Sequence, residues 1–386
     1  MNTKDTVSNI ATNSLLPVYN YLPLKPVRGD GLYLFDESGR PYLDFYGGHA
    51  VALLGYNHPR LVSTLTKQAS ELFFQSNIVA LDVREKAAAA LTEFSQLENH
   101  SVFFVNSGAE ANENALRLAC RATGKDHVVA LKGGFHGRTA AVAAATSSSE
   151  SWYGFPSRPF KTTFVDPNSV EQLTAAIGSG TAAVIMEPVM GMAGAVSLSK
   201  DFLTAARTAA DNHGAVLIFD EVQCGMGRSG YPFVANEKEV TPDILTVAKG
   251  IAGGYPAAAM LIKHHLSDVP GKGELGTTFG GAPMACALVT AVIDTIREEN
   301  LLENVRSGSA QIKDTCVVGP VESISGSGYL LGLHTVTPAR EVQTKLLDAG
   351  IVTGLSKNPN VVRLLPPLTL GSNEIQLLHD ALQKLS

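Results

Sequence analysis

Short apolar runs alternate with helical segments through the middle of this chain, and this alternation restricts the possible fold more than any other feature. The runs predicted as strands lie at residues 102–105, 128–131, 182–186, 216–219 and 244–248. Helical patterns lie between them at residues 109–122, 170–177 and 200–213. Strand–helix alternation is typical of a mostly parallel sheet with helices on both of its faces. We therefore expect an α/β fold.

The length and the flanking patterns predict a second unit. With 386 residues the chain exceeds one typical domain, so we expect about two. Before the alternation, residues 31–45 have alternating apolar residues around a polar turn, which predicts a β-hairpin. The other predicted segments are helices at 61–72, 83–94, 283–300 and 339–349, and strands at 329–334 and 361–365.

The composition argues against several classes of function. The net charge is −6, from 30 basic and 36 acidic residues, and no basic run is present, so nucleic-acid or anionic-membrane binding is not expected. The four cysteines form no C-x-x-C pair, which argues against a disulfide framework or a zinc site. No stretch approaches the ~18 uninterrupted apolar residues of a membrane span, and residues 1–14 lack the apolar core of a signal peptide. We expect a cytoplasmic protein without a bound metal.

Lys249 follows the predicted strand at 244–248 and stands among Gly250, Gly253 and Gly254. Burial would disfavour the charged form of this lysine and lower its pKa, which makes a lysine nucleophilic toward aldehydes. Alternatively, its side chain could end a strand and extend into solvent. This stretch alone leaves both interpretations open.

Two further predicted strands end in acids, at Glu187 and at Asp220. A buried carboxylate needs a partner, which could be a helix cap, a salt bridge or the basic ring nitrogen of a ligand. A packing explanation must account for three unrelated polar strand ends. A shared site at one sheet edge accounts for them together.

The strand at 102–105 leads into Ser107 and Gly108, and Glu110 completes the S-x-x-E spacing of a capping box. A capped helix is one reading of this segment. The other is a phosphate site, because a helix that starts after a strand presents free amides and a positive dipole end. Phe135 and Arg138, in a glycine-rich segment, could be a core aromatic and a surface arginine, or could stack on a planar cofactor and bind a carboxylate.

The segment 326–332 has the glycines of a dinucleotide fingerprint but one residue too many, and it leads into an apolar strand instead of out of one. We therefore do not expect a nucleotide there. The longest loop-like region, at residues 144–159, is rich in serine and contains aromatics, and loops of this length are often functional.

Taken together, these motifs resemble those of the class III aminotransferases, which use pyridoxal phosphate. They occur in the family's order over nearly the whole chain, and residues 43–51 and 55–59 fit the branch that acts on acyl-ornithines. The motifs are Asn106-Ser-Gly-Ala-Glu-Ala-Asn112, Phe135-His-Gly-Arg-Thr139, Glu187-Pro-Val189, Asp220-Glu-Val-Gln-x-Gly-Met-Gly-Arg-x-Gly230, Thr241-Pro-Asp-Ile-x-x-x-Ala-Lys249 and Gly276-Thr-Thr-Phe-Gly-Gly281.

The resemblance implies the fold type I architecture of pyridoxal-phosphate transferases, with a mostly parallel central sheet in a large domain plus a smaller α/β domain. The large cofactor-binding domain would span residues 47–285. The small domain would be formed by both chain ends, residues 1–46 and 286–386. The resemblance also implies a homodimer that shares its active sites, without nucleic acid or membrane partners.

The resemblance further assigns site residues. For the cofactor pyridoxal 5'-phosphate, Lys249 would bind the aldehyde carbon covalently, Asp220 would pair with the ring nitrogen and Gln223 with the ring hydroxyl. Phe135 would stack on the ring, and Glu187 would support the site. The phosphate would be held by Ser107, Gly108 and Ala109 together with Thr278 of the partner subunit. Lys249 and Asp220 would also be the catalytic pair. For substrates, Arg138 with Thr277 nearby would take the α-carboxylate of an acyl-ornithine, and Arg363 that of glutamate.

The implied activity moves the terminal amino group of N-acetylornithine, or a related N-acyl-ornithine, to 2-oxoglutarate in arginine biosynthesis. Alternatives on the same fold are other ω-amine donors, namely N-succinylornithine, acyl-lysine-type amines or 4-aminobutyrate, and a glutamate-semialdehyde aminomutase. One departure bears on substrate choice. Where the family usually reads Glu-Pro-Val-Gln-Gly-Glu-Gly-Gly, this chain has Met190 and Met192. The second family glutamate pairs with the arginine represented here by Arg363, and Met192 cannot do so.

Overall fold

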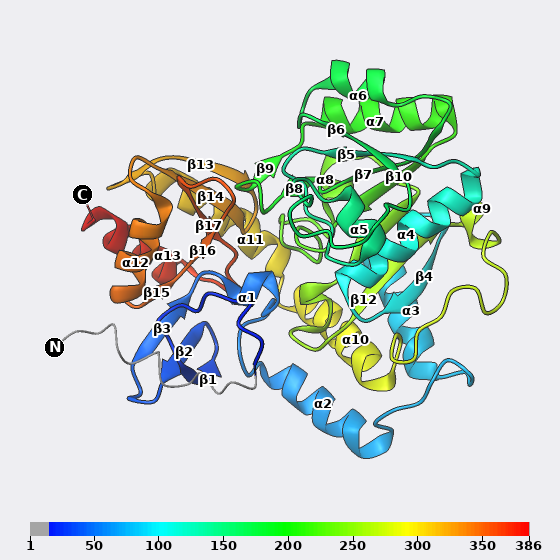
Figure 1. Cartoon of the computed structure of the whole chain (residues 1–386). Helices are drawn as coiled ribbons and strands as arrows, with labels where there is room; N and C mark the ends of the chain where they lie inside the picture. The colour runs from blue at the N-terminus through cyan, green and yellow to red at the C-terminus, as the bar shows by residue number, and fades with distance from the viewer. Residues whose placement is uncertain (1–14, 386) are drawn as a thin grey trace.

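A computed structural model describes residues 15–385 of the chain. The polar start at residues 1–14, and with it the beginning of the expected small domain, lies outside the described residues. Through the middle of the chain runs a seven-stranded sheet in the order β4-β12-β11-β10-β7-β5-β6 (Figure 1). Its strands are β4 (His100–Val105), β5 (His127–Leu131), β6 (Lys161–Val165), β7 (Thr181–Met186), β10 (Val216–Asp220), β11 (Ile244–Val247) and β12 (Ala258–Lys263).

Only β12 runs against its neighbours in this sheet, so the prediction of a mostly parallel sheet is confirmed. Side chains of each strand alternate between two apolar cores. Val184 and Leu217 belong to one core, and Ala183 and Ile218 to the other. Because neighbouring residues of a strand point to opposite faces, both faces of the sheet are buried.

Helices cover the two faces separately. Helix α4 (Gly108–Thr123) shares one core with the sheet, and α7 (Lys200–His213) and α10 (Pro283–Glu298) share the other. The other helices of this part of the chain are α2 (Pro59–Glu71), α3 (Asp82–Ser95), α5 (Ala140–Ala145), α6 (Val170–Ala176), α8 (Val234–Lys238), α9 (His264–Ser267) and the 3-10 turn η2 (Lys249–Ala252). Among residues 15–385, no helix is both long and apolar enough to cross a membrane.

The two ends of the described chain meet in two small sheets beside the large one. The first has the order β1-β2-β3-β15 and the second β13-β14-β17-β16. Their strands are β1 (Pro26–Asp30), β2 (Tyr33–Asp36), β3 (Pro41–Asp44), β13 (Val321–Ser327), β14 (Leu330–Thr335), β15 (Ile351–Val352), β16 (Gly354–Leu355) and β17 (Val361–Leu364). Figure 1 shows the blue and the orange-red ribbons side by side there. The join is the parallel pair β3–β15, where Leu43 lies opposite Ile351.

Three helices complete this region: α11 (Leu301–Thr315), α12 (Ala339–Asp348) and α13 (Ser372–Gln383). The predicted hairpin at 31–45 is confirmed by β2 and β3, which pair antiparallel. The glycine-rich segment 326–332 belongs to a hairpin, since β13 and β14 pair antiparallel from Ser327 and Leu330 onward. This is not the strand–turn–helix context that a dinucleotide site requires.

Candidate active site

The predicted polar strand ends meet at one edge of the large sheet. Strands β5, β7, β10 and β11 run parallel, so Phe135, Glu187, Asp220 and Lys249 all follow or end strands at their carboxyl edge. In open α/β sheets ligands bind outside this edge. The strand order thus brings together residues that are spread over more than a hundred positions of the sequence.

Asp220 is held by donors from two other segments. Its Oδ2 accepts hydrogen bonds from His136 Nδ1 and from Asn112 Nδ2, each at 2.7 Å, and its Oδ1 accepts one from the Val222 amide at 3.1 Å. Asn112 is fixed in turn, because its Oδ1 accepts a hydrogen bond from Thr246 Oγ1 at 2.6 Å. The carboxylate is buried, so these donors replace the water it would otherwise bind.

Sequence reasoning did not single out His136, Asn112 or Thr246. His136 stands inside the glycine-rich segment already noted, and Asn112 lies in the first turns of α4. The sequence shows that His136 and Asn112 carry donor groups, but it does not show that both donate to Asp220. His136 is 84 residues from Asp220 and Asn112 is 108 residues from it.

Lys249 carries its amino group into the same buried region. Burial lowers the pKa of Lys249, and the negative charges of Asp220 and Glu187 oppose this effect. Its backbone has a φ of 50°, in the left-handed region that lysine rarely adopts. Such strain persists where the surrounding structure fixes the residue, and it is concentrated at functional sites.

Glu187 faces the segment after β5. Its Oε1 accepts a hydrogen bond from the Phe135 amide at 2.9 Å. Burial raises the pKa of Glu187 above its usual range, and the nearby carboxylate of Asp220 adds to the effect. The two carboxyl groups therefore share one low-dielectric region with Lys249, where charge interactions are stronger than in water.

The first turn of α4 lies against this region. Ser107 Oγ accepts a hydrogen bond from the Glu110 amide at 3.1 Å, as the predicted capping box requires. The Glu110 carboxylate bonds the Asn106 amide at 2.9 Å instead of the Ser107 amide, so only half of the predicted box forms. A Cβ on Gly108 would lie 2.7 Å from Val222 Cγ1, so only glycine fits here without a shift. The amides of Gly108 and Ala109 begin the helix, where N–H groups lack intrahelical partners and favour an anion.

The segment that carries Phe135 and Arg138 packs onto this helix start. A Cβ on Gly137 would lie 2.8 Å from the Cβ of Ala109. The guanidinium of Arg138 lies 5.2 Å from the centre of the Phe135 ring, within the range of a cation–π contact. Arg138 is exposed and Phe135 is partly buried, so the arginine is open to a ligand while the ring is fixed.

The loop at residues 276–281 joins α4 from the other side. Thr277 Oγ1 accepts hydrogen bonds from Asn106 Nδ2 at 2.9 Å and from the Gly280 amide at 3.2 Å. Thr278 and Phe279 in the same loop are exposed. The structure thus places Thr277 beside the helix start and leaves Thr278 at the surface of the chain.

Arg363 lies in β17, a strand of the second small sheet, and is almost completely buried. Its Nε donates to the Leu355 carbonyl at 2.7 Å and its Nη2 to the Tyr46 hydroxyl at 2.8 Å. Its Nη1 is buried without a hydrogen-bond partner among the described residues. Burial lowers the pKa of Arg363. No salt bridge to Arg363 is found in residues 15–385, which agrees with the absence of a glutamate at Met192.

Gln223 presents a second unpartnered group nearby. Its Oε1 is buried without a hydrogen bond, and so is His136 Nε2. A Cβ on Gly191 would lie 1.7 Å from Gln223 Oε1 and 3.6 Å from Arg363 Nη1, so both atoms face the space that this glycine leaves. Unpartnered buried polar atoms of native proteins require an explanation, and a ligand is one.

These groups fit one kind of ligand. The start of α4 suits a phosphate, Asp220 suits a basic ring nitrogen, and Gln223 suits a ring hydroxyl. Lys249 suits an aldehyde. Among residues 15–385, no group of three or more histidine, cysteine, aspartate and glutamate side chains is arranged to hold a metal.

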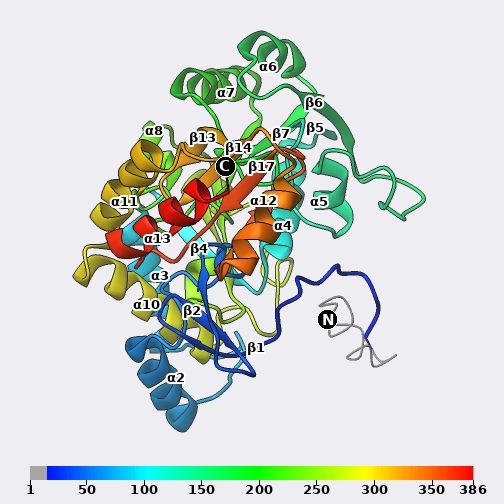
Figure 2. The same cartoon turned by 90° about the vertical axis from the view of Figure 1, so that its left-hand side faces the viewer.

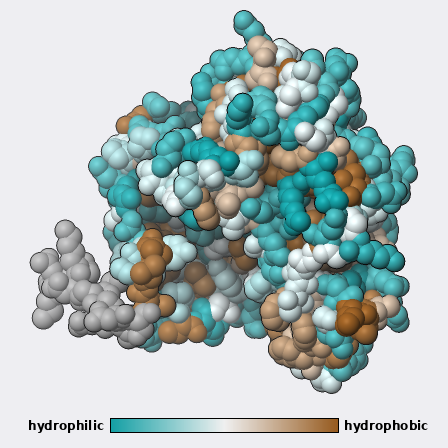
Figure 3. All heavy atoms as spheres, turned by 45° about the vertical axis from the view of Figure 1, so that its right-hand side comes forward, coloured by the Kyte–Doolittle hydropathy of each residue, from teal (hydrophilic) through white to brown (hydrophobic). Residues whose placement is uncertain are grey.

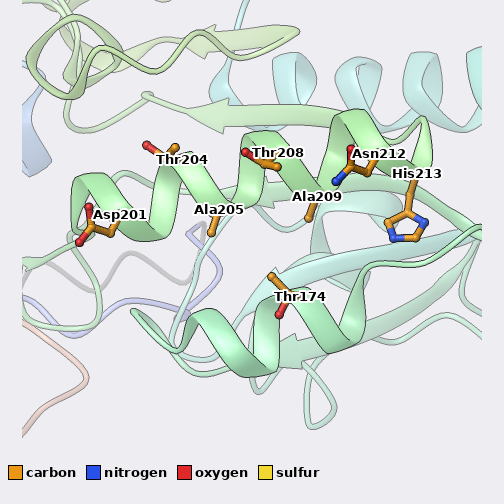
Figure 4. Close-up of a pocket in the computed structure, with 8 residues that line it drawn as sticks. All are labelled: Thr174, Asp201, Thr204, Ala205, Thr208, Ala209, Asn212 and His213. Carbon is orange, nitrogen blue, oxygen red and sulfur yellow. The ribbon is translucent and has the colours of Figure 1, made fainter.

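A pocket of about 480 Å³ lies elsewhere, between α6 and α7 (Figure 4). Its lining residues are Thr174, Asp201, Thr204, Ala205, Thr208, Ala209, Asn212 and His213. None of the residues at the carboxyl edge of the sheet contributes to it. We therefore assign the chemistry to the sheet edge.

Comparison with known proteins matches the same chain to one family. The family model described as aminotransferase class-III matches residues 17–385. The acetylornithine aminotransferase of Streptomyces coelicolor is 40% identical over 94% of this chain and 90% of its own length, and that of Vibrio vulnificus is 38% identical over 94% and 93%. The solved ornithine aminotransferase of Toxoplasma gondii, with partial occupancy of PLP at its active site, superposes with a TM-score of 0.92. It is 26% identical and covers 100% of this chain and 94% of that one.

Proposed function

Because this chain belongs to the class-III aminotransferases, we propose that it moves the terminal amino group of N-acetylornithine to 2-oxoglutarate with pyridoxal phosphate as cofactor. The products are the N-acetylglutamate semialdehyde and glutamate, a step of arginine biosynthesis. One observation carries the proposal. A partly buried lysine with a lowered pKa, a carboxylate fixed by two side-chain donors and the start of a 16-residue helix converge at one edge of a parallel sheet.

Each of these groups has a proposed role toward the cofactor. Lys249 binds it covalently, Asp220 pairs with its ring nitrogen, and Gln223 bonds its ring hydroxyl. Phe135 stacks on the ring beside Glu187. The phosphate is held by Ser107, Gly108 and Ala109 together with Thr278 of the partner subunit. When bound, the cofactor supplies an electron sink for the pair of electrons left when the substrate C–H bond loses its proton.

The chain itself moves that proton. The amino group of Lys249 has a lowered pKa, so a larger fraction of it is neutral and able to accept a proton from the substrate carbon. Asp220 holds a negative charge against the ring nitrogen, where positive charge is needed. His136 and Asn112 fix the position of that carboxylate before the reaction begins, so no reorganisation is required during it.

In this proposal each of two arginines binds the carboxylate of a different substrate. Arg138 is exposed and takes the α-carboxylate of the acyl-ornithine. Thr277 can assist, because its oxygen already accepts two bonds while its O–H is free to donate. Arg363 takes the α-carboxylate of glutamate and 2-oxoglutarate, for which its unpartnered Nη1 is suited.

The protein would act as a homodimer of two-domain subunits. Residues 47–285 form the proposed large domain, and residues 1–46 and 286–386 the small one, a division supported by the pairing of β3 with β15. An apolar patch made of Leu72, Phe73, Phe74, Ile78, Val79 and Phe279 is exposed beside Thr278. Phe74 and Phe279 contact each other, with ring centres 5.2 Å apart. A patch of this kind marks a protein interface.

A panel of amines with 2-oxoglutarate, scored by glutamate formation, tests the proposed function. N-acetylornithine should give the highest kcat/KM, above N-succinylornithine, acyl-lysine and 4-aminobutyrate. A higher value for another amine would reassign the donor. Turnover of glutamate semialdehyde without any external oxo acid would indicate an aminomutase instead.

A further inference from the structure

Among the described residues, Arg363 has only neutral hydrogen-bond partners. One of these partners, Tyr46, has no role in the proposed function. The Tyr46 hydroxyl lies 2.8 Å from Arg363 Nη2 and 2.6 Å from His49 Nδ1. The rings of Tyr46 and His49 are in edge contact, with centres 4.8 Å apart. The Arg363 guanidinium carbon lies 5.5 Å from the centre of the Tyr46 ring. The three side chains therefore form one cluster.

The directions of these hydrogen bonds follow from the groups involved. An arginine can only donate, so the Tyr46 oxygen accepts from Arg363. The Tyr46 proton is then free to donate to His49 Nδ1, which requires a neutral imidazole with its own proton on Nε2. His49 is exposed by surface area, but desolvation by the neighbouring protein lowers its pKa, and the positive charges of Arg363, Lys249 and Arg138 lower it further. The neutral form that the geometry requires is thus the form that the surroundings favour.

The backbone that carries this cluster is strained. Gly47, Gly48, His49 and Ala50 have φ values of 53°, 55°, 66° and 71°, which makes α1 (Gly47–Ala50) a left-handed turn. The left-handed conformation is unfavourable for residues other than glycine, because the Cβ lies too close to the following carbonyl oxygen. The Ala50 amide closes the turn on the Tyr46 carbonyl at 3.0 Å. Strain of this kind persists at functional sites because surrounding contacts hold it.

Those contacts are present. The buried carboxylate of Asp44 accepts hydrogen bonds from the Tyr46 amide at 2.7 Å and from the Gly47 amide at 3.0 Å. The Leu365 amide, two residues beyond Arg363, donates to the Phe45 carbonyl at 2.6 Å. The turn is therefore attached to the strand that carries Arg363.

We propose that Tyr46, held by His49, is the positioning residue of Arg363 and fixes the selectivity of this enzyme for the α-carboxylate of the dicarboxylic substrate. This inference rests on the proposed function, in which Arg363 binds glutamate and 2-oxoglutarate. A glutamate partner would neutralise the arginine and would have to be displaced by the incoming carboxylate. Tyr46 forms no ion pair with the arginine and occupies Nη2 only. Nη1 remains for the substrate, so the site for the dicarboxylate is permanently open.

The test compares Tyr46→Phe with wild-type holoenzyme in the two separate half-reactions. With glutamate, the concentration for half-maximal rate should rise about tenfold to a hundredfold, because a hydrogen bond to a charged group is lost, while the saturated rate changes less. With N-acetylornithine the same constant should change several-fold less. Calorimetric affinity for 2-oxoglutarate, which does not react with the aldehyde form, should fall in parallel with the glutamate constant.

A matched control removes a buried tyrosine hydroxyl elsewhere. Tyr329→Phe deletes the hydroxyl that donates to the Leu370 carbonyl at 3.1 Å and that is hydrogen-bonded to neither Arg363 nor Tyr46, so it should keep the wild-type ratio of the two constants. His49→Leu removes the acceptor of the Tyr46 proton and should shift the ratio in the direction of Tyr46→Phe. His49→Gln keeps an acceptor oxygen and should recover part of the loss. If Tyr46→Phe fails to fold, these two variants of His49 still test the positioning role of Tyr46.

The variant Arg363→Ala distinguishes a failure of this inference from a failure of the proposed function. If Arg363→Ala loses glutamate binding while Tyr46→Phe and His49→Leu behave like Tyr329→Phe, the positioning role is wrong and the proposed function stands. If Arg363→Ala keeps its affinity for glutamate, the assignment of Arg363 is wrong and the inference fails with it.

Discussion

Lys249 combines a partly buried side chain, whose amino group has a lowered pKa, with a left-handed backbone conformation that lysine rarely adopts. The residue starts η2 (Lys249–Ala252), which is capped by Gly253 with a φ of 61°. Strand β11 fixes the chain before it and the glycines permit the sharp turn after it. The amino group is therefore positioned by the backbone and not by a hydrogen bond of its own, which leaves it free for covalent chemistry.

Replacing Lys249 should remove covalent attachment of the cofactor without unfolding the protein. Wild-type protein with pyridoxal phosphate, reduced with borohydride, should gain the mass of the reduced cofactor on the chain. Lys249→Ala should gain none at that position, and Lys263→Ala, at the end of β12, should behave as wild type. Intact-mass and peptide spectra decide the matter. Labelling of Lys249→Ala at the wild-type level would remove Lys249 from its proposed role.

Glu221 gives the folded protein a pH dependence that can be isolated. Its oxygens accept hydrogen bonds from the amides of Val234 and Ala235 at 2.7 and 2.8 Å. Burial nevertheless raises its pKa from 4.5 to about 7. Between these values the folded state keeps a proton that the unfolded state has lost. Stability therefore falls as the pH rises through this window, by on the order of 3 kcal/mol.

Glu221→Gln should make that fall shallower, since the variant has no proton to lose at this position. Melting temperatures measured from pH 4.5 to about 7 give the slope. A slope remains from Glu187, whose pKa burial also raises. Glu322→Gln, at an exposed position of β13, should leave the slope of the wild type. An unchanged slope in Glu221→Gln would contradict the assignment.

A residue of the site could be predicted from the sequence when the sequence pattern directly around it pointed to a function. Asp220 and Glu187 end apolar runs, and Lys249 follows one within a glycine-rich turn, so each is recognisable locally. Tyr46 and His49 were not, because their significance depends on Arg363. Tyr46 and Arg363 are 317 residues apart, and no local pattern links them.

At the scale of elements, the predictions succeeded where a strand is buried on both faces. Strand β7 is buried at every residue and reads as a continuous apolar run. Strand β6, at the edge of the sheet, has two exposed residues in the sequence Lys-Thr-Thr-Phe-Val and was missed. Edge strands lack the apolar run because one side faces solvent.

Other elements were missed for other reasons. Strand β12, helices α5, α11 and α13, and strand β13 were not predicted, and the region predicted as loop-like at 144–159 overlaps the last two residues of α5. Helix α11 is polar on most of its surface and contains Gly308, which weakens a helix pattern. The structure explains this glycine. A Cβ there would lie 1.9 Å from the Tyr329 hydroxyl.

Gly308→Ala should therefore destabilise the protein, although the same change in an open helix stabilises it by about 1 kcal/mol. Overpacking of this kind costs about 1–3 kcal/mol. Thermal unfolding should show a lower melting temperature for Gly308→Ala and nearly the wild-type value for Ser307→Ala, its exposed neighbour. Adding Tyr329→Phe should restore part of the loss. A melting temperature above that of the wild type would show that α11 is not packed on Tyr329.

At the scale of the whole molecule, the small sheets and the large sheet share the site. Arg363 and Tyr46 come from the two ends of the chain, and Lys249 and Asp220 come from its middle. Figure 2 shows β17 and α12 from the late part of the chain in front of the central sheet. The alternation in the sequence predicted the large sheet, but only the three-dimensional structure reveals which parts of the ends face it.

The apolar patch around Ile78 permits a test of assembly. Ile78 is 86% exposed, and Figure 3 shows apolar residues reaching the surface at several places. Burying a charge in an interface is costly, so the double variant Phe73→Asp/Ile78→Asp should be a monomer if the wild type is the dimer that we propose. Its affinity for pyridoxal phosphate should fall as well, because the proposed phosphate contact from Thr278 of the partner subunit would be lost.

Sedimentation with a fluorescence titration of the cofactor measures both effects. Leu377→Asp, on the exposed side of α13, adds a charge at another half-exposed apolar position and should remain a dimer. A double variant that stays dimeric would place the interface elsewhere. A monomer that keeps full cofactor affinity would instead assign the phosphate site to one chain alone.

The join between β3 and β15 has a consequence for synthesis in the cell. The Arg40 guanidinium bonds the carbonyl of Asp348, which is 308 residues later in the chain. At the usual speed of a ribosome, roughly 15 to 60 seconds separate the emergence of these two segments. During that interval the hairpin of β2 and β3 presents an unpaired strand edge, for which chaperones and other nascent chains compete. A chain whose synthesis stops before residue 363 thus has a Tyr46 without its arginine partner.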